Sequence, residues 1–166
     1  MILYILRHGI AEDRVKGRSD AERALTDEGR ARTLGVAKGL RKLGIRYEAL
    51  LTSPLVRAVE TAAIVSEIFE DRPALEKLDE LAAGVATATS VAALKPFARM
   101  NEVIIVGHEP GLGQIAAALL TGSAQGLGIV LKKAGCVALE VGSFTPRAGA
   151  LLLWMMTPGQ LRLIGK

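Results

Sequence analysis

Cysteine is the scarcest chemically reactive residue in this sequence. Cys136 is the only cysteine among 166 residues, so the chain has no internal disulfide and no metal site built from several thiolates. Its neighbours form an apolar run, which indicates that Cys136 is a small core residue of a strand. The sequence therefore does not favour a thiol-based redox function or a structural zinc site.

Aromatic residues and basic runs are also scarce. Phe, Tyr and Trp together make up 4% of the residues, and no basic run is longer than Lys132-Lys133, although the formal net charge is +4. Nucleic-acid-binding proteins use aromatic stacking and clustered basic residues. The positive charge therefore favours a small anionic ligand, and we expect no nucleic acid as partner.

Long hydrophobic runs are absent. The apolar start of the chain is interrupted by Arg7 after six residues, which is too short for a signal-peptide core, and no later run approaches the ~18 residues of a membrane span. We therefore expect a soluble, cytoplasmic protein that contacts no membrane. Half of the residues are hydrophobic and 23% are charged, which suits one globular domain over residues 1–166. We expect that domain to be a monomer.

Short apolar runs alternate with longer helical patterns, which is typical of a βαβ fold. The predicted strands are residues 2–6, 48–52, 75–78, 102–106, 136–141 and 150–156, and the predicted helices are residues 26–43, 53–69, part of 88–99, and 112–120. The turn-rich segment 142–149 joins the last two strands as an antiparallel pair. The pattern predicts a three-layer α/β/α sandwich whose sheet is mostly parallel and ends in this antiparallel pair.

Cap residues set the ends of the first two predicted helices. Thr26 is the expected N-cap of the first helix, and Gly44 ends it. Ser53 followed by Pro54 resembles a cap residue with proline at the first helical position, so the second helix is expected to begin there.

Polar residues follow two of the predicted parallel strands at the point where each strand ends. Arg7 and His8 come directly after the first strand, and His108 comes after the strand 102–106. Open α/β sheets bind ligands at this carboxyl edge. Arg57 lies in the first turn of the second helix, whose N-terminus attracts anions. We therefore expect two arginines, two histidines and a helix end to converge on one point.

Each of these residues also has an ordinary explanation, because helix arginines are usually solvated and strand-end histidines are usually structural. The conjunction favours function, since both histidines of the chain follow strands and each adjoins a glycine, Gly9 or Gly107. The segment 107–114 contains a G-x-G, but position 116 is Ala116, so the dinucleotide-binding fingerprint is incomplete.

Three motifs together resemble those of the histidine phosphatase superfamily, which includes the phosphoglycerate mutases and acid phosphatases. They are Arg7-His8-Gly9, the segment 53–58 with Glu60-Thr61 behind it, and Val106-Gly107-His108. The short chain, the segment 23–26 with Gly29, and Asp79-Glu80-Leu81 resemble in particular the small bacterial phosphohistidine phosphatases of the SixA type. The resemblance spans residues 2 to about 158 and implies a phosphoglycerate mutase-like fold.

The resemblance also implies a mechanism. His8 would be the nucleophile and would carry a phosphohistidine intermediate, because a neutral imidazole is nucleophilic near pH 7. Arg7, Arg57 and His108 would hold the phosphoryl oxygens, where charge spreads in the transition state. The implied reaction needs neither a metal nor another cofactor.

Four further residues are assigned by position only. Glu80 is the candidate acid that protonates the leaving group, and a surface carboxylate is the equal alternative. Arg23 is a candidate contact at the rim of the pocket, or else an exposed loop arginine, and Gly9 is a candidate substrate contact through its backbone. Glu109 either orients His108 or points to solvent.

Three functions remain possible at this point. The stretch between residues 69 and 102 has room for only a short strand and one helix, so no long insertion covers the site. An open pocket favours phosphohistidine on a partner protein as the substrate. The second possibility is hydrolysis of small phosphate esters, and the third is a non-catalytic module that binds phosphate or nucleic acid.

Overall fold

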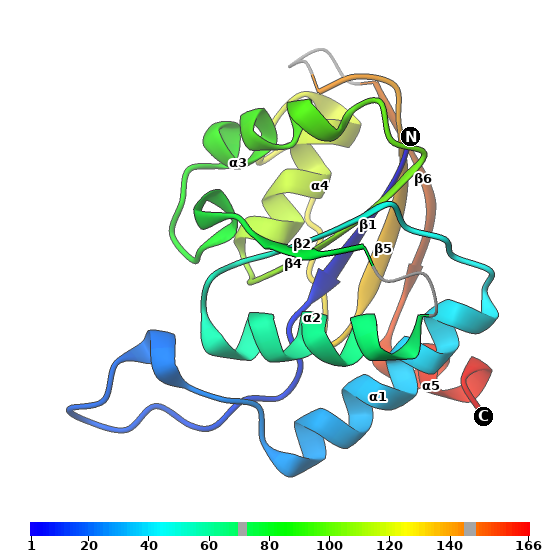
Figure 1. The fold of residues 1–166 in the computed structure, drawn as a ribbon. Helices are drawn as coiled ribbons and strands as arrows, with labels where there is room; N and C mark the ends of the chain where they lie inside the picture. Colours follow the sequence, from blue (N-terminus) through cyan, green and yellow to red (C-terminus); the bar gives the residue numbers. More distant parts are fainter. Residues whose placement is uncertain (70–72, 145–148) are drawn as a thin grey trace.

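The computed structural model describes residues 1–69, 73–144 and 149–166 (Figure 1). The strands are β1 (Ile2–Arg7), β2 (Ala49–Thr52), β3 (Leu75–Lys77), β4 (Glu102–Gly107), β5 (Cys136–Val141) and β6 (Ala150–Met156). The α-helices are α1 (Asp27–Lys42), α2 (Val56–Ile68), α3 (Thr87–Ala93), α4 (Gly111–Thr121) and α5 (Pro158–Ile164). Short 3-10 helices are η1 (Asp20–Glu22), η2 (Asp79–Leu81) and η3 (Lys95–Phe97). Within the described ranges, no helix combines the length and apolar character needed to cross a membrane.

The strands form one sheet in the order β3-β2-β4-β1-β5-β6. The first four are parallel to one another, whereas β5 runs antiparallel to β1 and β6 antiparallel to β5. The prediction of a mostly parallel sheet with an antiparallel C-terminal pair is confirmed. Part of the predicted connecting turn, residues 145–148, lies outside the described residues.

Helices cover both faces of the sheet, with α1, α2 and α5 on one face and α3 and α4 on the other (Figure 1). Alternate residues of β1 explain this: Tyr4 and Leu6 pack in the first core, and Leu3 and Ile5 pack in the second. A strand that is buried on both faces has no solvent-exposed side that needs polar residues, and β1 and β4 are therefore continuous apolar runs. The three-layer prediction is confirmed.

The N-terminus of α1 is formed as predicted. The side-chain oxygen of Thr26 accepts a hydrogen bond from the backbone N–H of Gly29 at 3.0 Å, and Gly44 follows the helix with φ of +80°. This helix therefore begins and ends at the residues that the sequence indicated.

The predicted start of α2 at Ser53-Pro54 is wrong, because the helix begins at Val56. The backbone N–H of Ser53 still pairs with the carbonyl of Val106 in β4 at 2.9 Å, so Ser53 belongs to the sheet edge. Its hydroxyl lies 2.8 Å from Nε2 of His108 and accepts a bond from the N–H of Leu55. The predicted end near Phe69 is confirmed, since Phe69 caps the helix.

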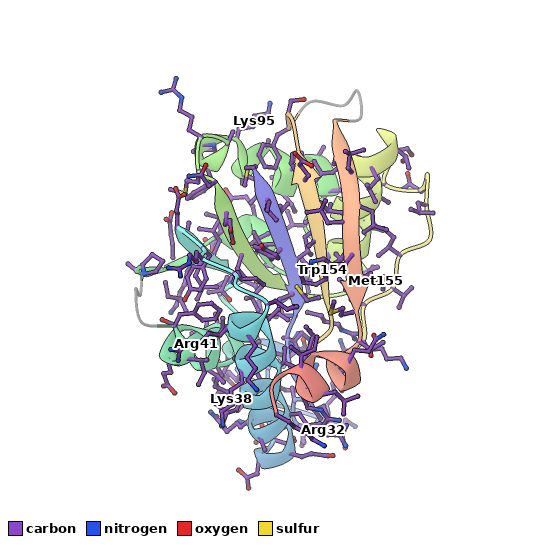
Figure 2. All side chains as sticks on the ribbon, turned by 90° about the vertical axis from the view of Figure 1, so that its right-hand side faces the viewer. Arg32, Lys38, Arg41, Lys95, Trp154 and Met155 are labelled. Atoms are coloured by element: carbon purple, nitrogen blue, oxygen red, sulfur yellow. The ribbon has the colours of Figure 1, made fainter. Side chains whose placement is uncertain are left out.

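The remaining helices agree with the sequence except for one. The helix expected within residues 88–99 is α3, which is followed by η3 with Pro96 in its first turn. Helix α5 was not predicted, although Thr157 and Gln160 form a capping box before it. It lies beside α1, and Gly39 permits the contact because a Cβ there would be 2.1 Å from the Leu161 carbonyl oxygen. Figure 2 shows this pair below the β6 edge, where Trp154 is marked.

Candidate active site

His8 lies directly after β1, and its side chain is buried, with 6% of the residue exposed. Nδ1 lies 2.7 Å from the carbonyl oxygen of Gly9. Because a carbonyl oxygen can only accept, Nδ1 must carry the proton and donate it. The other ring nitrogen, Nε2, therefore has a free lone pair in the neutral ring.

His108 lies directly after β4, next to His8. Arg7 and Gly107 are register partners of the parallel β1–β4 pair, so the residues that follow them leave the sheet side by side. The two imidazole ring centroids are 5.0 Å apart. Both histidines are at least 94% buried.

The hydroxyl of Ser53 is the hydrogen-bond partner of His108. Ser53 Oγ accepts the N–H of Leu55 and lies 2.8 Å from Nε2 of His108, to which the hydroxyl hydrogen can be donated. A ring that accepts at Nε2 carries its proton at Nδ1. That Nδ1 is buried and has no hydrogen-bond partner among the described residues.

The electrostatic environment keeps both rings neutral near pH 7. Burial, followed by the electrostatic effect of His108 and of the nearby arginines, lowers the pKa of His8 to about 3. For His108, burial is again the largest cause and the positive charge of Arg57 the second, and the pKa is lowered to about 4. A neutral His8 is the form that attacks an electrophile.

Arg7 and Arg57 are each braced through their terminal nitrogens. Arg7 Nη1 donates to the carbonyl of Leu131 at 2.6 Å. Arg57, which is 3% exposed in the first turn of α2, donates from Nη1 to the Asp20 carbonyl at 2.7 Å and from Nη2 to the Asp20 carboxylate at 3.0 Å. The Nε atoms of both arginines are buried without a partner in the described part of the chain. Each guanidinium is therefore held firmly while one N–H stays available.

Arg23 joins this group through Asp20. Its Nε donates to the Asp20 carboxylate at 2.9 Å, and its Nη1 donates to the carbonyl of Glu12 at 2.6 Å. Its side chain is 16% exposed, and its charge acts on both Arg57 and His108. The structure thus places this arginine beside the site rather than in free solvent.

Glu80 lies in η2, at the carboxyl end of β3 and thus on the same edge of the sheet as the histidines. The carbonyl oxygen of Leu81, the next residue, is 3.4 Å from the position of a Cβ on Gly107. Ser90 donates to the Glu80 carbonyl at 2.6 Å and fixes this backbone. In residues 1–69, 73–144 and 149–166, the half-buried Glu80 carboxylate has no hydrogen-bond or ion-pair partner.

Glu109 takes neither of the two roles expected for it. One carboxylate oxygen accepts the N–H of Leu131 at 2.7 Å, and the other accepts the N–H of Gly113 at 3.4 Å. Because the carbonyl of Leu131 is the acceptor for Arg7, Glu109 supports the segment that braces Arg7.

The two glycines beside the histidines lie at close packing contacts. A Cβ on Gly9 would lie 2.4 Å from Thr33 Oγ1, and a Cβ on Gly107 would lie 3.1 Å from Leu112. The N–H of Gly9 donates to Thr61 Oγ1 at 3.0 Å, so that backbone group is already bonded within the protein. Both glycines therefore allow close packing at the carboxyl edge of the sheet.

Sequence reasoning missed three parts of this site: Ser53 as the partner of His108, Asp20 as the partner of Arg57, and the Leu131 carbonyl as the acceptor for Arg7. Ser53 carried a signal, but it was interpreted as a helix cap. Asp20 and Leu131 carried none, because both lie in segments between regular elements.

The chemistry that this arrangement allows is anion binding beside a neutral nucleophile. Three buried nitrogens, Arg7 Nε, Arg57 Nε and His108 Nδ1, have no partner in the described chain, and the neutral His8 ring keeps a lone pair at Nε2. Charge-assisted donors of this kind stabilise the oxygens of a phosphoryl group during transfer. No group of three or more His, Cys, Asp or Glu side chains that could hold a metal ion occurs among the described residues.

Comparisons with known sequences agree with this chemistry. The family model of the histidine phosphatase superfamily (branch 1) matches residues 3–96. An uncharacterised protein of a Picosynechococcus strain is 39% identical over 145 residues, which are 86% of this chain and 87% of that protein. The mitochondrial serine/threonine-protein phosphatase Pgam5 of Drosophila mojavensis is 35% identical over 83 residues, 49% of this chain and 28% of its own length.

Comparisons with solved structures show the same fold. The protein histidine phosphatase SixA, solved with tungstate, superposes with a TM-score of 0.85 and 24% identity, over 97% of this chain and 99% of that one. The alpha-ribazole phosphatase of Shigella flexneri gives a TM-score of 0.77 and 17% identity, over 95% of this chain and 97% of that one.

Proposed function

This chain belongs to the histidine phosphatase superfamily, and we propose that it is a metal-independent phosphatase that removes phosphate from phosphohistidine on a partner protein. The observation that carries the proposal is the state of His8. Its Nδ1–H is bonded to the Gly9 carbonyl, so the neutral ring keeps a lone pair at Nε2, and His108, Arg57 and Arg7 are close enough to act on it electrostatically. The complex of SixA with tungstate, an oxyanion, supports an anion-binding role for this fold.

The first step is attack by His8. A bond forms between Nε2 and phosphorus while the bond from phosphorus to the leaving nitrogen breaks, and the electron pair goes to the leaving imidazole, which departs neutral because its other ring nitrogen already carries a proton. The positive charge that develops on the His8 ring is stabilised by the Gly9 carbonyl at Nδ1. The three oxygens of the transferring group accept from Arg7 Nε, Arg57 Nε and His108 Nδ1, where their charge develops.

The second step is hydrolysis of the intermediate. The oxygen of a water molecule attacks phosphorus, the bond to Nε2 breaks, and its electron pair returns to the His8 ring. The proton lost by the water goes to the phosphate or to solvent. Because burial keeps the pKa of His8 near 3, the ring leaves the reaction neutral and ready for another cycle.

The open edge of the sheet supports a protein substrate. Between α2 and β4, the described residues contain only β3, η2, α3 and η3, with no inserted domain. A phosphorylated side chain on a folded protein can enter such an open site, whereas a small molecule binds most tightly in a pocket that encloses it. SixA, whose fold this chain shares, is described as a protein histidine phosphatase.

A substrate panel tests the proposal. Turnover is measured on a phosphohistidine-bearing protein, on free phosphohistidine and on a set of small phosphate esters, with and without a chelator, with His8→Asn as the inactive control. We expect the highest kcat/KM on the phosphoprotein, unchanged by the chelator. A higher kcat/KM on an ester would make the protein a phosphomonoesterase. Binding of phosphate without turnover of any substrate would make it a non-catalytic phosphate-binding module.

A further inference from the structure

Two segments outside the regular elements form walls of the candidate active site. The first, residues 12–24, includes η1 and is bonded to Arg57 through the backbone carbonyl and one carboxylate oxygen of Asp20. The second, residues 127–133, is bonded to Arg7 through the Leu131 carbonyl, and the next residue, Ala134, donates its N–H to the His8 carbonyl at 3.0 Å. We call these two segments the rim. Any protein that delivers a phosphorylated side chain to His8 must approach past the rim.

The rim exposes apolar side chains. Val15 is 61% exposed in the first segment, and Val130 and Leu127 are 73% and 45% exposed in the second. Val130 immediately precedes the residue that braces Arg7. Single exposed apolar residues are normal on a surface, but these occur on the two segments that hold Arg57 and Arg7, where a partner surface would cover them.

The rim also carries positive charge that the protein does not use. Lys16, Lys132 and Lys133 are exposed, and in the described ranges none of them forms an ion pair. The three arginines of the first segment are already paired with acidic groups, Arg14 and Arg23 with Asp20, and Arg18 with Glu12.

Acidic side chains offset the charge of the first segment but not that of the second. Asp13 and Glu22 are the exposed acids of the first segment that remain outside those pairs, and the segment 127–133 has no acidic residue. The lysine pair at 132–133 therefore presents its charge directly beside the Arg7 side of the pocket.

These side chains suit a large substrate and not a small one. The segment 12–24 projects away from the sheet, past the ends of α1 and α2 (Figure 1). A phosphate bound to Arg7, Arg57 and His108 lies in the buried centre, so a small ester contacts that centre and leaves the outer lysines in water. Only a substrate of protein size spans both segments.

We propose that Val15, Lys16, Val130, Lys132 and Lys133 form the docking surface for the phosphoprotein, and that the partner presents an acidic face with an apolar centre. This inference rests on the proposed function and adds the chemistry of the partner. Opposite charges steer the encounter and raise the association rate, an effect that salt screens. The docking surface thus acts on kcat/KM for the protein substrate and leaves the chemical step unchanged.

Charge reversal tests the docking surface. The double variant Lys132→Glu/Lys133→Glu is compared with wild type on three substrates: an acidic phosphohistidine protein, a basic one, and free phosphohistidine. We expect at least a tenfold loss of kcat/KM on the acidic protein through a higher KM, and a change of less than twofold on free phosphohistidine. The wild-type preference for the acidic protein should shrink between 50 and 300 mM salt, and the variant should depend less on salt.

A matched control variant reverses two exposed lysines of α1, Lys38→Glu/Lys42→Glu, which changes the net charge equally at a distance from the site. It should retain the wild-type kcat/KM on all three substrates. Equal activity of the rim variant on the acidic protein would overturn the docking inference, and so would an equal loss on free phosphohistidine. A wild-type enzyme that cleaves only small esters would refute the proposed function itself, which is a separate outcome.

Discussion

Asp20 binds Arg57 through two atoms, its backbone carbonyl at 2.7 Å and its carboxylate at 3.0 Å. The second carboxylate oxygen of Asp20 accepts from Arg23 and Arg14. A residue of the loop after β1 therefore decides the orientation of an arginine on α2. We regard Asp20 as a positioning residue, since its own contacts are with the arginines and not with the reacting atoms.

Asp20→Ala should lower kcat by about tenfold or more, because it removes a charge-assisted hydrogen bond worth ~1.5–3 kcal/mol from a buried guanidinium. Asp20→Asn keeps an oxygen at the same position and should recover most of that loss. Steady-state kinetics on free phosphohistidine measure both variants, and thermal unfolding shows whether folding is affected. If Asn is as damaging as Ala, the oxygen does not position Arg57.

His8→Asn should abolish the covalent intermediate. Rapid quenching of wild type with labelled substrate should trap phosphate that is labile in acid and stable in base, as a phosphoramidate is. The variant should trap none. Label that persists on the variant would assign the nucleophile to another residue.

Acid should destabilise the folded protein through the two histidines. Their folded-state pKa values, about 3 for His8 and about 4 for His108, lie below the ordinary value of 6.5 that they have when unfolded. Between pH 6.5 and 5 the unfolded chain therefore binds protons that the folded chain does not, and stability falls by about 2 kcal/mol per histidine. Urea unfolding at pH 7 and pH 5 measures the loss, and His108→Gln should remove about half of it. An unchanged loss in that variant would contradict the neutral state of His108.

Glu80→Gln should affect two reactions unequally. An alkoxide leaving group needs a proton in the transition state, to which a positioned acid contributes ~10²–10⁴-fold, whereas a phosphoramidate nitrogen is protonated before its bond breaks. Turnover of phosphohistidine should stay within about tenfold of wild type while alkyl phosphate hydrolysis falls by the larger factor. Equal large losses would make Glu80 an essential acid, and no loss on either substrate would remove it from the mechanism.

The order of helices and strands could be predicted from the sequence because buried segments have a recognisable local pattern of apolar residues. Strands such as Glu102–Gly107 are continuous apolar runs, and Thr26 is a cap that acts within one helix turn. Helix α5 was missed because it has only seven residues, of which Leu161 alone is buried. Its packing depends on Gly39, which lies far away in the chain.

The sequence predicted the residues of the candidate site whose positions follow from the order of strands in the sheet. Arg7, His8 and His108 end parallel strands, so the rule for carboxyl edges brings them together without knowledge of any contact. The partners that orient them are different. Asp20 reaches Arg57 across 37 positions and Leu131 reaches Arg7 across 124, and no local pattern encodes either hydrogen bond.

The strand order β3-β2-β4-β1 has a consequence for how the chain becomes active during its synthesis. β1 and β2 never pair with each other, because β4 lies between them and is made last of the three. While the ribosome is still translating residues before 102, both earlier strands lack their shared neighbour, and their apolar side chains have no complete layer to enter. His8 and Arg57 are already present in that nascent chain, but the sheet that positions β1 relative to β2 is not yet formed. Insertion of β4 is therefore the folding event that joins β1 to β2 and brings His108 beside His8, and β5 and β6 complete the sheet afterwards.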